Sequence, residues 1–172
     1  MMLEKIFAIA AMLFALVAVA MKKSWQIFAL SAVANLLTCS SFFVLGGAVS
    51  GMAISLVGGV QCIVATIYAS KGKSFPIYMK IVFFVLYAVF GISNIKAMYD
   101  ILPFIASMLC MTAIFQKHPQ RIRLLNSLNA ATWIVYNYIV GSTALYSQII
   151  FFLMNIITMF TYRNKTANAS DN

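Results

Sequence analysis

Acidic residues and histidine are scarce in this 172-residue chain, and charge of either sign is rare. Asp and Glu together number 3 against 12 Lys and Arg, and charged residues make up only 9% of the chain, where a soluble domain has about a quarter. Hydrophobic residues make up 63%. This composition excludes an ordinary soluble domain and predicts an all-α polytopic membrane protein, whose spans need about 20 apolar residues each.

The shortage of titratable groups also argues against an enzyme. Common catalytic sites need paired carboxylates, a nucleophile beside a base, or clustered metal ligands. The acids are Glu4, Asp100 and Asp171, and the histidine is His118. Asp100 is expected at the outer end of the fifth helix and His118 in a cytoplasmic loop, about one membrane thickness away. We therefore expect no catalytic residues, no metal site and no cofactor.

Cysteine offers no disulfide framework either. Cys39, Cys62 and Cys110 are odd in number and lie in apolar segments, where a free thiol behaves as a small hydrophobic group. The basic residues lie scattered at the ends of apolar segments instead of forming one patch, so a nucleic-acid partner is not expected. The partner that the composition indicates is the lipid bilayer.

Seven apolar segments are expected to form transmembrane helices. They cover about residues 6–21, 25–45, 48–69, 77–92, 101–116, from the basic loop 117–123 to 140, and 144–162. The first segment, preceded by Lys5, also resembles a secretory signal. An uncleaved first helix is favoured, because cleavage would leave Lys22 and Lys23 at an extracytoplasmic terminus.

Basic residues alternate between the two sides of such a bundle. Ten lie on one side: Lys22, Lys23, Lys71, Lys73, Lys80, Lys117, Arg121, Arg123, Arg163 and Lys165. Only Lys5 and Lys96 lie on the other side. The positive-inside rule makes the first side cytoplasmic, so we expect an outside N-terminus and a cytoplasmic C-terminus. At the outer side, Asp100 is expected to be a solvated loop acid, with a guard at the mouth of a pathway as the alternative.

The chain also contains an internal repeat. A shift of 95 residues places Lys22 on Lys117, Thr38 on Trp133 and Gly46-Gly47 on Gly141-Ser142, with a slip of about two residues in the third helices. This pattern predicts a 3+1+3 parallel repeat of three-helix bundles. The predicted parts are a first repeat at 1–70, a linker helix at 71–97, a second repeat at 98–163 and a disordered cytoplasmic tail at 164–172. A chance likeness between apolar segments is the alternative.

Polar side chains form a stripe on the sixth helix and another on the seventh. At 100° per residue the sixth-helix residues fall on one face: Asn126, Asn129, Trp133, Tyr136 and Asn137. The seventh helix carries Gln148, Asn155 and Tyr162 on one face. An amide in hydrocarbon needs a hydrogen-bond partner, so both stripes should face the bundle interior or a wet cavity.

These stripes define the candidate site. We predict a substrate-binding site made of Asn126, Asn129, Trp133, Tyr136, Asn137, Gln148 and Asn155. The second helix carries a milder stripe of smaller groups. The alternative is that the amides only tie helices together.

Several of these residues also carry a family resemblance. Ile101-Leu102-Pro103, the stretch Trp133-x-x-Tyr136-Asn137-Tyr138-x-x-Gly141-Ser142 and the later Met154-Asn155 resemble the bacterial inner-membrane YgjV family. More distantly, the 3+1+3 plan is similar to SWEET, SemiSWEET and PnuC-type transporters. In those families an aromatic residue on the second helix of a triplet and an asparagine on the third contact the solute. The resemblance therefore implies that role for Trp133 and Asn155.

The sequence and the resemblance together favour a transporter. No acid is expected at the bilayer midplane, so an ion relay is missing and the transporter would be a facilitator. Aromatic faces and amides suit a small polar solute such as a sugar, nucleoside or vitamin, moved by alternating access between the two bundles. The alternative is a non-transporting inner-membrane scaffold or regulatory protein that acts through its basic cytoplasmic loops.

Overall fold

The computed structural model of the chain describes residues 2–21, 23–46, 48–115 and 119–168, and helices joined by short connections make up these ranges. The helices are α1 (Met2–Ala20), α2 (Ser24–Leu45), α3 (Val49–Ser70), α4 (Ile77–Ser93), α5 (Ile101–Phe115), α6 (Pro119–Val140) and α7 (Ala144–Asn168), with a short 3-10 helix, η1 (Met98–Asp100), before α5. No strand occurs in these ranges. The prediction of an all-helical fold with seven long helices is confirmed for the described residues.

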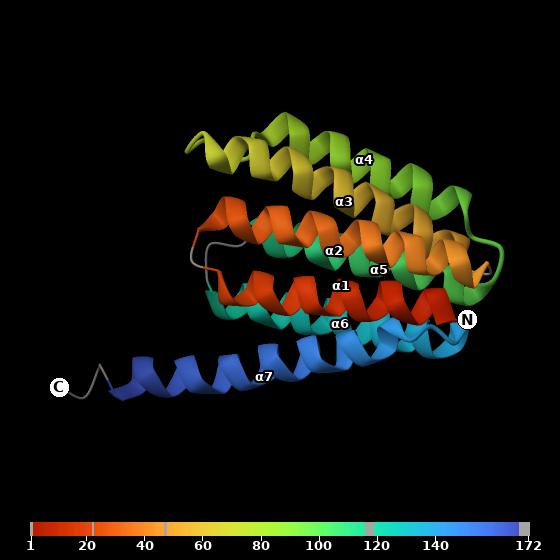
Figure 1. Cartoon of the computed structure of the whole chain (residues 1–172). Coiled ribbons are helices and arrows are strands. Elements are labelled where there is room, and N and C mark those ends of the chain that lie inside the picture. Colours follow the sequence, from red (N-terminus) through yellow and green to blue (C-terminus); the bar gives the residue numbers. More distant parts are fainter. Residues whose placement is uncertain (1, 22, 47, 116–118, 169–172) are drawn as a thin grey trace.

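The helices form one bundle in which consecutive helices run in opposite directions (Figure 1). Within the first helix group, α1–α3, α2 packs against both neighbours, and within the second helix group, α5–α7, α6 does the same. Between the groups, α1 packs against α7 and α3 packs against α5, while α4 lies against α3 and α5. The two groups are therefore joined along two seams.

The bundle has two distinct ends (Figure 1). The start of α1 and the α2–α3, α4–α5 and α6–α7 connections lie at the end that contains Glu4, called here the Glu4 end. The α1–α2, α3–α4 and α5–α6 connections lie at the opposite end, called the Phe75 end after a residue of the α3–α4 connection.

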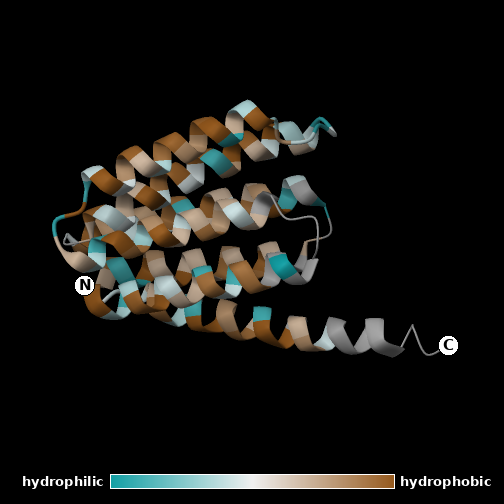
Figure 2. Ribbon diagram, turned by 180° about the vertical axis from the view of Figure 1, so that it is seen from behind, coloured by the Kyte–Doolittle hydropathy of each residue, from teal (hydrophilic) through white to brown (hydrophobic). Residues whose placement is uncertain are grey.

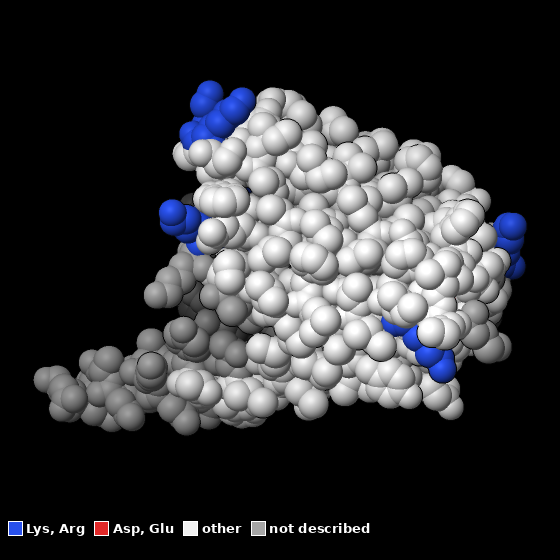
Figure 3. All heavy atoms as spheres, in the orientation of Figure 1, with Lys and Arg blue, Asp and Glu red and all other residues white. Residues whose placement is uncertain are grey.

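Apolar side chains cover the outside of the bundle. Three helices are long and apolar enough to cross a membrane, at Trp25–Leu45, Val49–Ser70 and Ala144–Thr161, and Ile77–Ser93 and Met98–Ala113 are shorter apolar helices. In Figure 2 apolar residues run along the helices, with single hydrophilic residues between them. On the face drawn in Figure 3, Lys and Arg lie toward the two ends and no Asp or Glu is visible. Such an apolar surface needs lipid around it.

Glycine and proline set the ends of several helices. Gly46 after α2 and Gly141 after α6 both adopt left-handed backbone angles, with φ of 79° and 69°, which favour glycine because it has no Cβ. Pro76 precedes α4 and Pro119 is the first residue of α6, where a missing N–H has no intrahelical partner to lose. Pro103 lies in the first turn of α5, so it begins this helix without bending it.

Three helices extend beyond their predicted limits, and α1 does so at its start, which lies at Met2 instead of about residue 6. α6 begins at Pro119, so Arg121 and Arg123, assigned to a loop from the sequence, lie in its first two turns. Proline at a first helical position accounts for this early start. α7 continues to Asn168, five residues into the segment predicted to be disordered, because residues 163–168 contain no glycine or proline to stop it. Residues 169–172 of that segment lie outside the described ranges.

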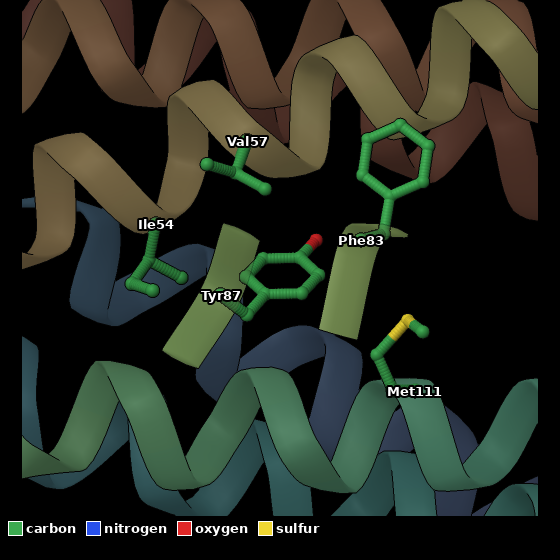
Figure 4. Packing of buried hydrophobic residues seen from close by; sticks show 5 residues of the cluster. All are labelled: Ile54, Val57, Phe83, Tyr87 and Met111. Carbon is green, nitrogen blue, oxygen red and sulfur yellow. The ribbon is translucent and has the colours of Figure 1, made fainter. Parts of the chain in front are cut away.

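An apolar cluster fixes the position of α4. Phe83 and Tyr87 of α4 lie between Ile54 and Val57 of α3 and Met111 of α5, and all five side chains are buried (Figure 4). Gln61 of α3 adds polar contacts, since its amide oxygen accepts a hydrogen bond of 2.7 Å from the Tyr87 hydroxyl and its amide nitrogen lies 3.0 Å from the Met111 sulfur. Here a buried amide does tie helices together.

Gly51 of α3 permits a close approach by α6. A Cβ at this position would lie 2.7 Å from a ring carbon of Tyr136 and 2.9 Å from its hydroxyl oxygen. Tyr136 is fully buried, so its ring has no free space to move into. The contact between α3 and α6 therefore requires glycine at residue 51.

We expect Gly51→Ala to lower the free energy of unfolding by about 1–3 kcal/mol, the usual cost of overpacking. Gly59→Ala in the same helix is the matched control, because its new methyl would have no contact shorter than 3.0 Å, to Cδ2 of the flexible Leu36 side chain, with Leu36 Cγ at 3.1 Å. Thermal unfolding of both purified variants in detergent measures the difference. Equal melting temperatures for the two variants would contradict the steric argument.

Candidate functional site

A cavity of about 700 Å³ lies inside the bundle, and residues from all seven helices line it. None of the described lining residues carries a charge. Six of the seven predicted site residues line this one cavity: Asn126, Asn129, Trp133, Asn137, Gln148 and Asn155. The two polar stripes thus meet at a shared space. Tyr162 is outside the residues whose side chains are described.

Tyr136 lies elsewhere, although it was predicted to belong to the same site. It does not line the cavity, and its side chain is 0% exposed. On a helix at 100° per residue, Tyr136 sits about 60° around the axis from Trp133, toward α3. The space left by Gly51 accepts its ring there.

Aromatic packing around Tyr136 closes the Glu4 end of the cavity. Phe42, Ala48 and Tyr136 form a buried cluster, with Leu102 and Val140 among the residues packed against it. The rings of Phe42 and Tyr136 meet edge to face at 5.8 Å. At its inner side this cluster meets Trp133, whose indole stacks on Phe42 at 6.0 Å with an interplanar angle of 16°.

The cavity reaches toward the opposite end of the bundle. Its lining includes Ala18 near the end of α1, Ala65 near the end of α3 and Ala113 near the end of α5. It also includes Phe75 in the α3–α4 connection and Asn126 in the first half of α6. The cavity is therefore sealed at the Glu4 end and extends to the Phe75 end.

Glu4 joins α1 to the second helix group at the sealed end. Its side chain is 4% exposed. One carboxylate oxygen, Oε1, accepts hydrogen bonds from the Thr143 hydroxyl at 2.8 Å, the Thr143 backbone N–H at 3.0 Å and the Ser142 hydroxyl at 3.2 Å. The Ser41 hydroxyl of α2 adds a fourth donor at 3.3 Å. Hydrogen bonds to a charged group are stronger than neutral ones, so this contact holds α1 against the α6–α7 turn.

Asp100, just before α5, makes a comparable contact with α3 of the first helix group. It is 6% exposed, so the expected solvated loop acid is wrong. Its Oδ1 accepts a hydrogen bond of 2.7 Å from the Ser50 hydroxyl of α3, and its Oδ2 accepts from the backbone N–H groups of Lys96 and Ala97. Burial opposes ionisation, but these hydrogen bonds and the Lys96 charge outweigh it, so the pKa of Asp100 lies below its ordinary value.

A chain of hydrogen bonds links Asp100 to α6. Ser50 has one hydroxyl proton, which goes to Asp100, so the Tyr136 hydroxyl donates to the Ser50 oxygen at 3.0 Å. Tyr136 in turn accepts from the Gly51 backbone N–H at 3.0 Å. Donors that polarise one another along a chain strengthen each bond. Tyr136 is therefore part of the seal in both its ring and its hydroxyl.

The amides of the candidate site do not tie helices together within the described part of the chain. The amide nitrogens of Asn137 and Asn155 donate to carbonyls of their own helices, at Trp133 and Phe151. The side-chain oxygens of Asn129 and Asn137 are buried without a hydrogen-bond partner. An unpaired buried acceptor is costly, so each of these oxygens needs a donor that the described side chains do not supply, such as a water molecule or a ligand.

Sequence reasoning missed Glu4 and Ser50. Glu4 precedes the first apolar segment, which was predicted to begin at about residue 6, and only the start of α1 at Met2 brings it into a helix. The partner could not be identified, because Thr143 follows it by 139 residues. Ser50 had no distinguishing signal, since a lone serine after a glycine turn is common.

Comparisons with known proteins give one match. The model of a family described as bacterial inner membrane protein matches residues 2–166, which is nearly the whole chain. No curated protein and no solved structure matches the chain.

We expect Glu4→Leu to lower the free energy of unfolding by about 1–3 kcal/mol for each donor left buried and unpaired, chiefly those of Ser142 and Thr143. Glu4→Gln keeps an acceptor oxygen and should cost less. Lys5→Met is the control, because the Lys5 side chain is exposed beside Glu4. Thermal unfolding in detergent ranks the three variants, and a Lys5→Met loss as large as that of Glu4→Leu would contradict the assignment.

Proposed function

Because the chain belongs to the Imp-YgjV family of bacterial inner membrane proteins, we propose that it is a facilitator of a small uncharged polar solute across that membrane. The observation that carries this proposal is the uncharged, polar-striped cavity closed at one end of an apolar bundle. A cavity lined by a few placed polar groups among apolar ones is the usual form of a small-molecule site.

An internal repeat in the cavity lining supports the proposed 3+1+3 architecture. A shift of 95 residues relates lining residues of α1 to those of α5, as in Ala15 and Cys110, and lining residues of α2 to those of α6, as in Thr38 and Trp133. A shift of 93 residues relates lining residues of α3 and α7, with the pairs Ile54 and Ser147, Ser55 and Gln148, Gly58 and Phe151, and Cys62 and Asn155. Two copies of one triplet facing a common axis would produce this pattern, and sites at repeat interfaces are typical of transporters.

The two carboxylate contacts support the same architecture. Glu4 of the first group bonds to Thr143 at the start of α7, and Asp100 of the second group bonds to Ser50 near the start of α3. The shift of 93 residues that relates the linings of α3 and α7 also relates Ser50 to Thr143. Each group therefore places an acid against the corresponding hydroxyl of the other.

The lysines at the two ends of the bundle support an inward-facing arrangement, in which the cavity extends toward the cytoplasm. Lys23, Lys71 and Lys73 lie at the Phe75 end, whereas Lys5 and Lys96 lie at the Glu4 end. By the positive-inside rule the Phe75 end is cytoplasmic, with the N-terminus outside and the C-terminus inside. The proposed cycle breaks the Glu4 and Asp100 contacts to open the cavity outward, and no lining acid among the described residues provides ion coupling.

The native cysteines test the proposed access. Cys62 lines the cavity and Cys39 does not, so single-cysteine variants that retain only one of them form a matched pair. We expect a membrane-impermeant methanethiosulfonate to modify Cys62 at least about tenfold faster from the cytoplasmic side, in inverted vesicles, than from outside in spheroplasts. Modification of Cys39 should lack this asymmetry.

Removing the Glu4 and Ser50 contacts should change the side of the membrane from which Cys62 is modified. In the variant that retains only Cys62, we expect Glu4→Leu combined with Ser50→Ala to raise the rate of modification from outside at least about fivefold, because the outward-open state gains population. Lys5→Met is the control. If Cys62 is inaccessible from both sides in every variant, the transport proposal fails and the non-transporting scaffold or regulatory protein is favoured.

A further inference from the structure

A second, smaller hollow lies at the Glu4 end of the bundle, where α6 ends and α7 begins. Its volume is about 200 Å³, and it is called here the outer pocket. Its lining comes from the last turn of α6, the α6–α7 connection and the first turn of α7, and includes Asn137, Tyr138, Gly141, Ser142, Thr143 and Tyr146. Tyr138 and Tyr146 are 76% and 65% exposed, so the outer pocket lies at the surface of the bundle. Tyrosine is common where a membrane protein meets the interface between lipid and water.

Asn137 is the one residue that the described linings of the cavity and the outer pocket share. It is 1% exposed, and its amide nitrogen donates to the Trp133 carbonyl of its own helix at 2.8 Å. Among the described residues, no side chain of α7 forms a hydrogen bond with the Asn137 amide. The Asn137 side chain therefore separates the two hollows and is held by its own helix alone.

The two hollows follow each other along the contact between α6 and α7. Residues four apart are neighbours on the surface of a helix. On α6 a series with this spacing runs from the cavity to the outer pocket: Asn129, Trp133, Asn137 and Gly141. On α7 a series with the same spacing runs from the outer pocket into the cavity: Thr143, Ser147, Phe151 and Asn155. The outer pocket thus continues the line of the cavity toward the Glu4 end, and Asn137 interrupts that line.

The first helix group has an aromatic ring at the corresponding place. The shift of 95 residues that places Gly46 on Gly141 also places Phe42 on Asn137. Phe42 is 1% exposed, and its ring packs against the rings of both Trp133 and Tyr136. An opening at Phe42 would have to displace several closely packed rings. An opening at Asn137 needs the movement of one short side chain that has a hollow on either side of it.

The Glu4 contact holds the turn that borders the outer pocket. Ser142 and Thr143 line this pocket, and their hydroxyls donate to Glu4 Oε1 at 3.2 Å and 2.8 Å. The Ser142 backbone N–H donates to the Asn137 carbonyl at 2.9 Å. Loss of the Glu4 contact would therefore release a turn that is bonded directly to Asn137.

We propose that the outer end of the solute path runs between α6 and α7, and that the Asn137 side chain is the gate across it. The inference rests on the proposed function and names the route by which the cavity opens outward. With the Glu4 contact formed, Asn137 closes the cavity against the outer pocket. When that contact breaks, the α6–α7 turn and Asn137 move, and the two hollows join.

Removal of the gate side chain tests the proposal. In the variant that retains only Cys62, the same impermeant methanethiosulfonate gives the ratio of the modification rate from outside, in spheroplasts, to the rate from the cytoplasmic side, in inverted vesicles. We expect Asn137→Ala to raise this ratio at least about fivefold, because the cavity then connects to the outer pocket.

Asn155→Ala is the matched control. Asn155 also lines the cavity, and its amide also donates to the carbonyl four residues earlier, but it does not line the outer pocket. The ratio for Asn155→Ala should equal that of the parent variant. A ratio is used because a change in the reactivity of Cys62 itself affects both rates equally.

A larger side chain at the gate should have the opposite effect. Asn137→Phe introduces the ring that the first helix group has at this place. Added to the combined Glu4→Leu and Ser50→Ala changes, it should return the rate of modification from outside to within about twofold of the parent rate. A path along the axis of the bundle, past Tyr136, would leave that rate raised.

The outcomes separate this proposal from the transport proposal. An Asn137→Ala ratio equal to that of Asn155→Ala overturns the gate, and an outside rate that stays raised after Asn137→Phe overturns the route. If Asn137→Phe lowers the melting temperature enough to indicate a folding defect, Asn137→Ala decides alone. In each of these cases, faster modification of Cys62 from the cytoplasmic side still supports the transporter. If Cys62 is inaccessible from both sides in every variant, both proposals fail.

Discussion

Two buried carboxylates at one end of the bundle hold its two helix groups together. An acid removed from water is stable only when hydrogen-bond donors surround it, and Glu4 and Asp100 obtain theirs from the α6–α7 turn and from α3. Each carboxylate therefore fixes the position of a helix group other than its own. The aromatic seal, the position of Tyr136 and the closed end of the cavity all follow from this mutual constraint.

The cavity exists because the seams between the groups are tight at one end and open at the other. Gly51 allows Tyr136 to approach the backbone of α3, and Phe42 fills the space beside it. Farther from this end the lining changes to small residues such as Ala15, Ala18 and Ala113, which leave volume between the helices. Small side chains at helix contacts usually permit close packing, but when they face a common axis they leave a hollow. The amide stripes border that hollow and remain partly unpaired.

The sequence predicted much of this arrangement because the bilayer imposes simple rules on the chain. Apolar runs of the right length identified seven helices, and helical periodicity placed six of the seven site residues on faces that meet at one cavity. Membership of the YgjV family, expected from the stretch around Trp133 and Asn137, is confirmed by the family match. The more distant likeness to SWEET and PnuC-type transporters stays an interpretation. Helix limits were less accurate, since Pro119 starts α6 earlier and α7 continues to Asn168.

By itself the sequence determined the membrane class, the helices and the polar faces, because these depend on local periodicity and composition. Only the tertiary structure decided that Tyr136 seals the cavity, that Asp100 is buried, and that Glu4 bonds to Thr143. Each of these depends on a contact between residues far apart in the chain, and helical periodicity gives the direction of a side chain but not the neighbour it meets. The tertiary structure also decided which polar atoms of the cavity-lining residues are already paired. An asparagine offers both donor and acceptor in the sequence, and in the folded helix the Asn137 amide donates to the Trp133 carbonyl while its oxygen is buried without a partner.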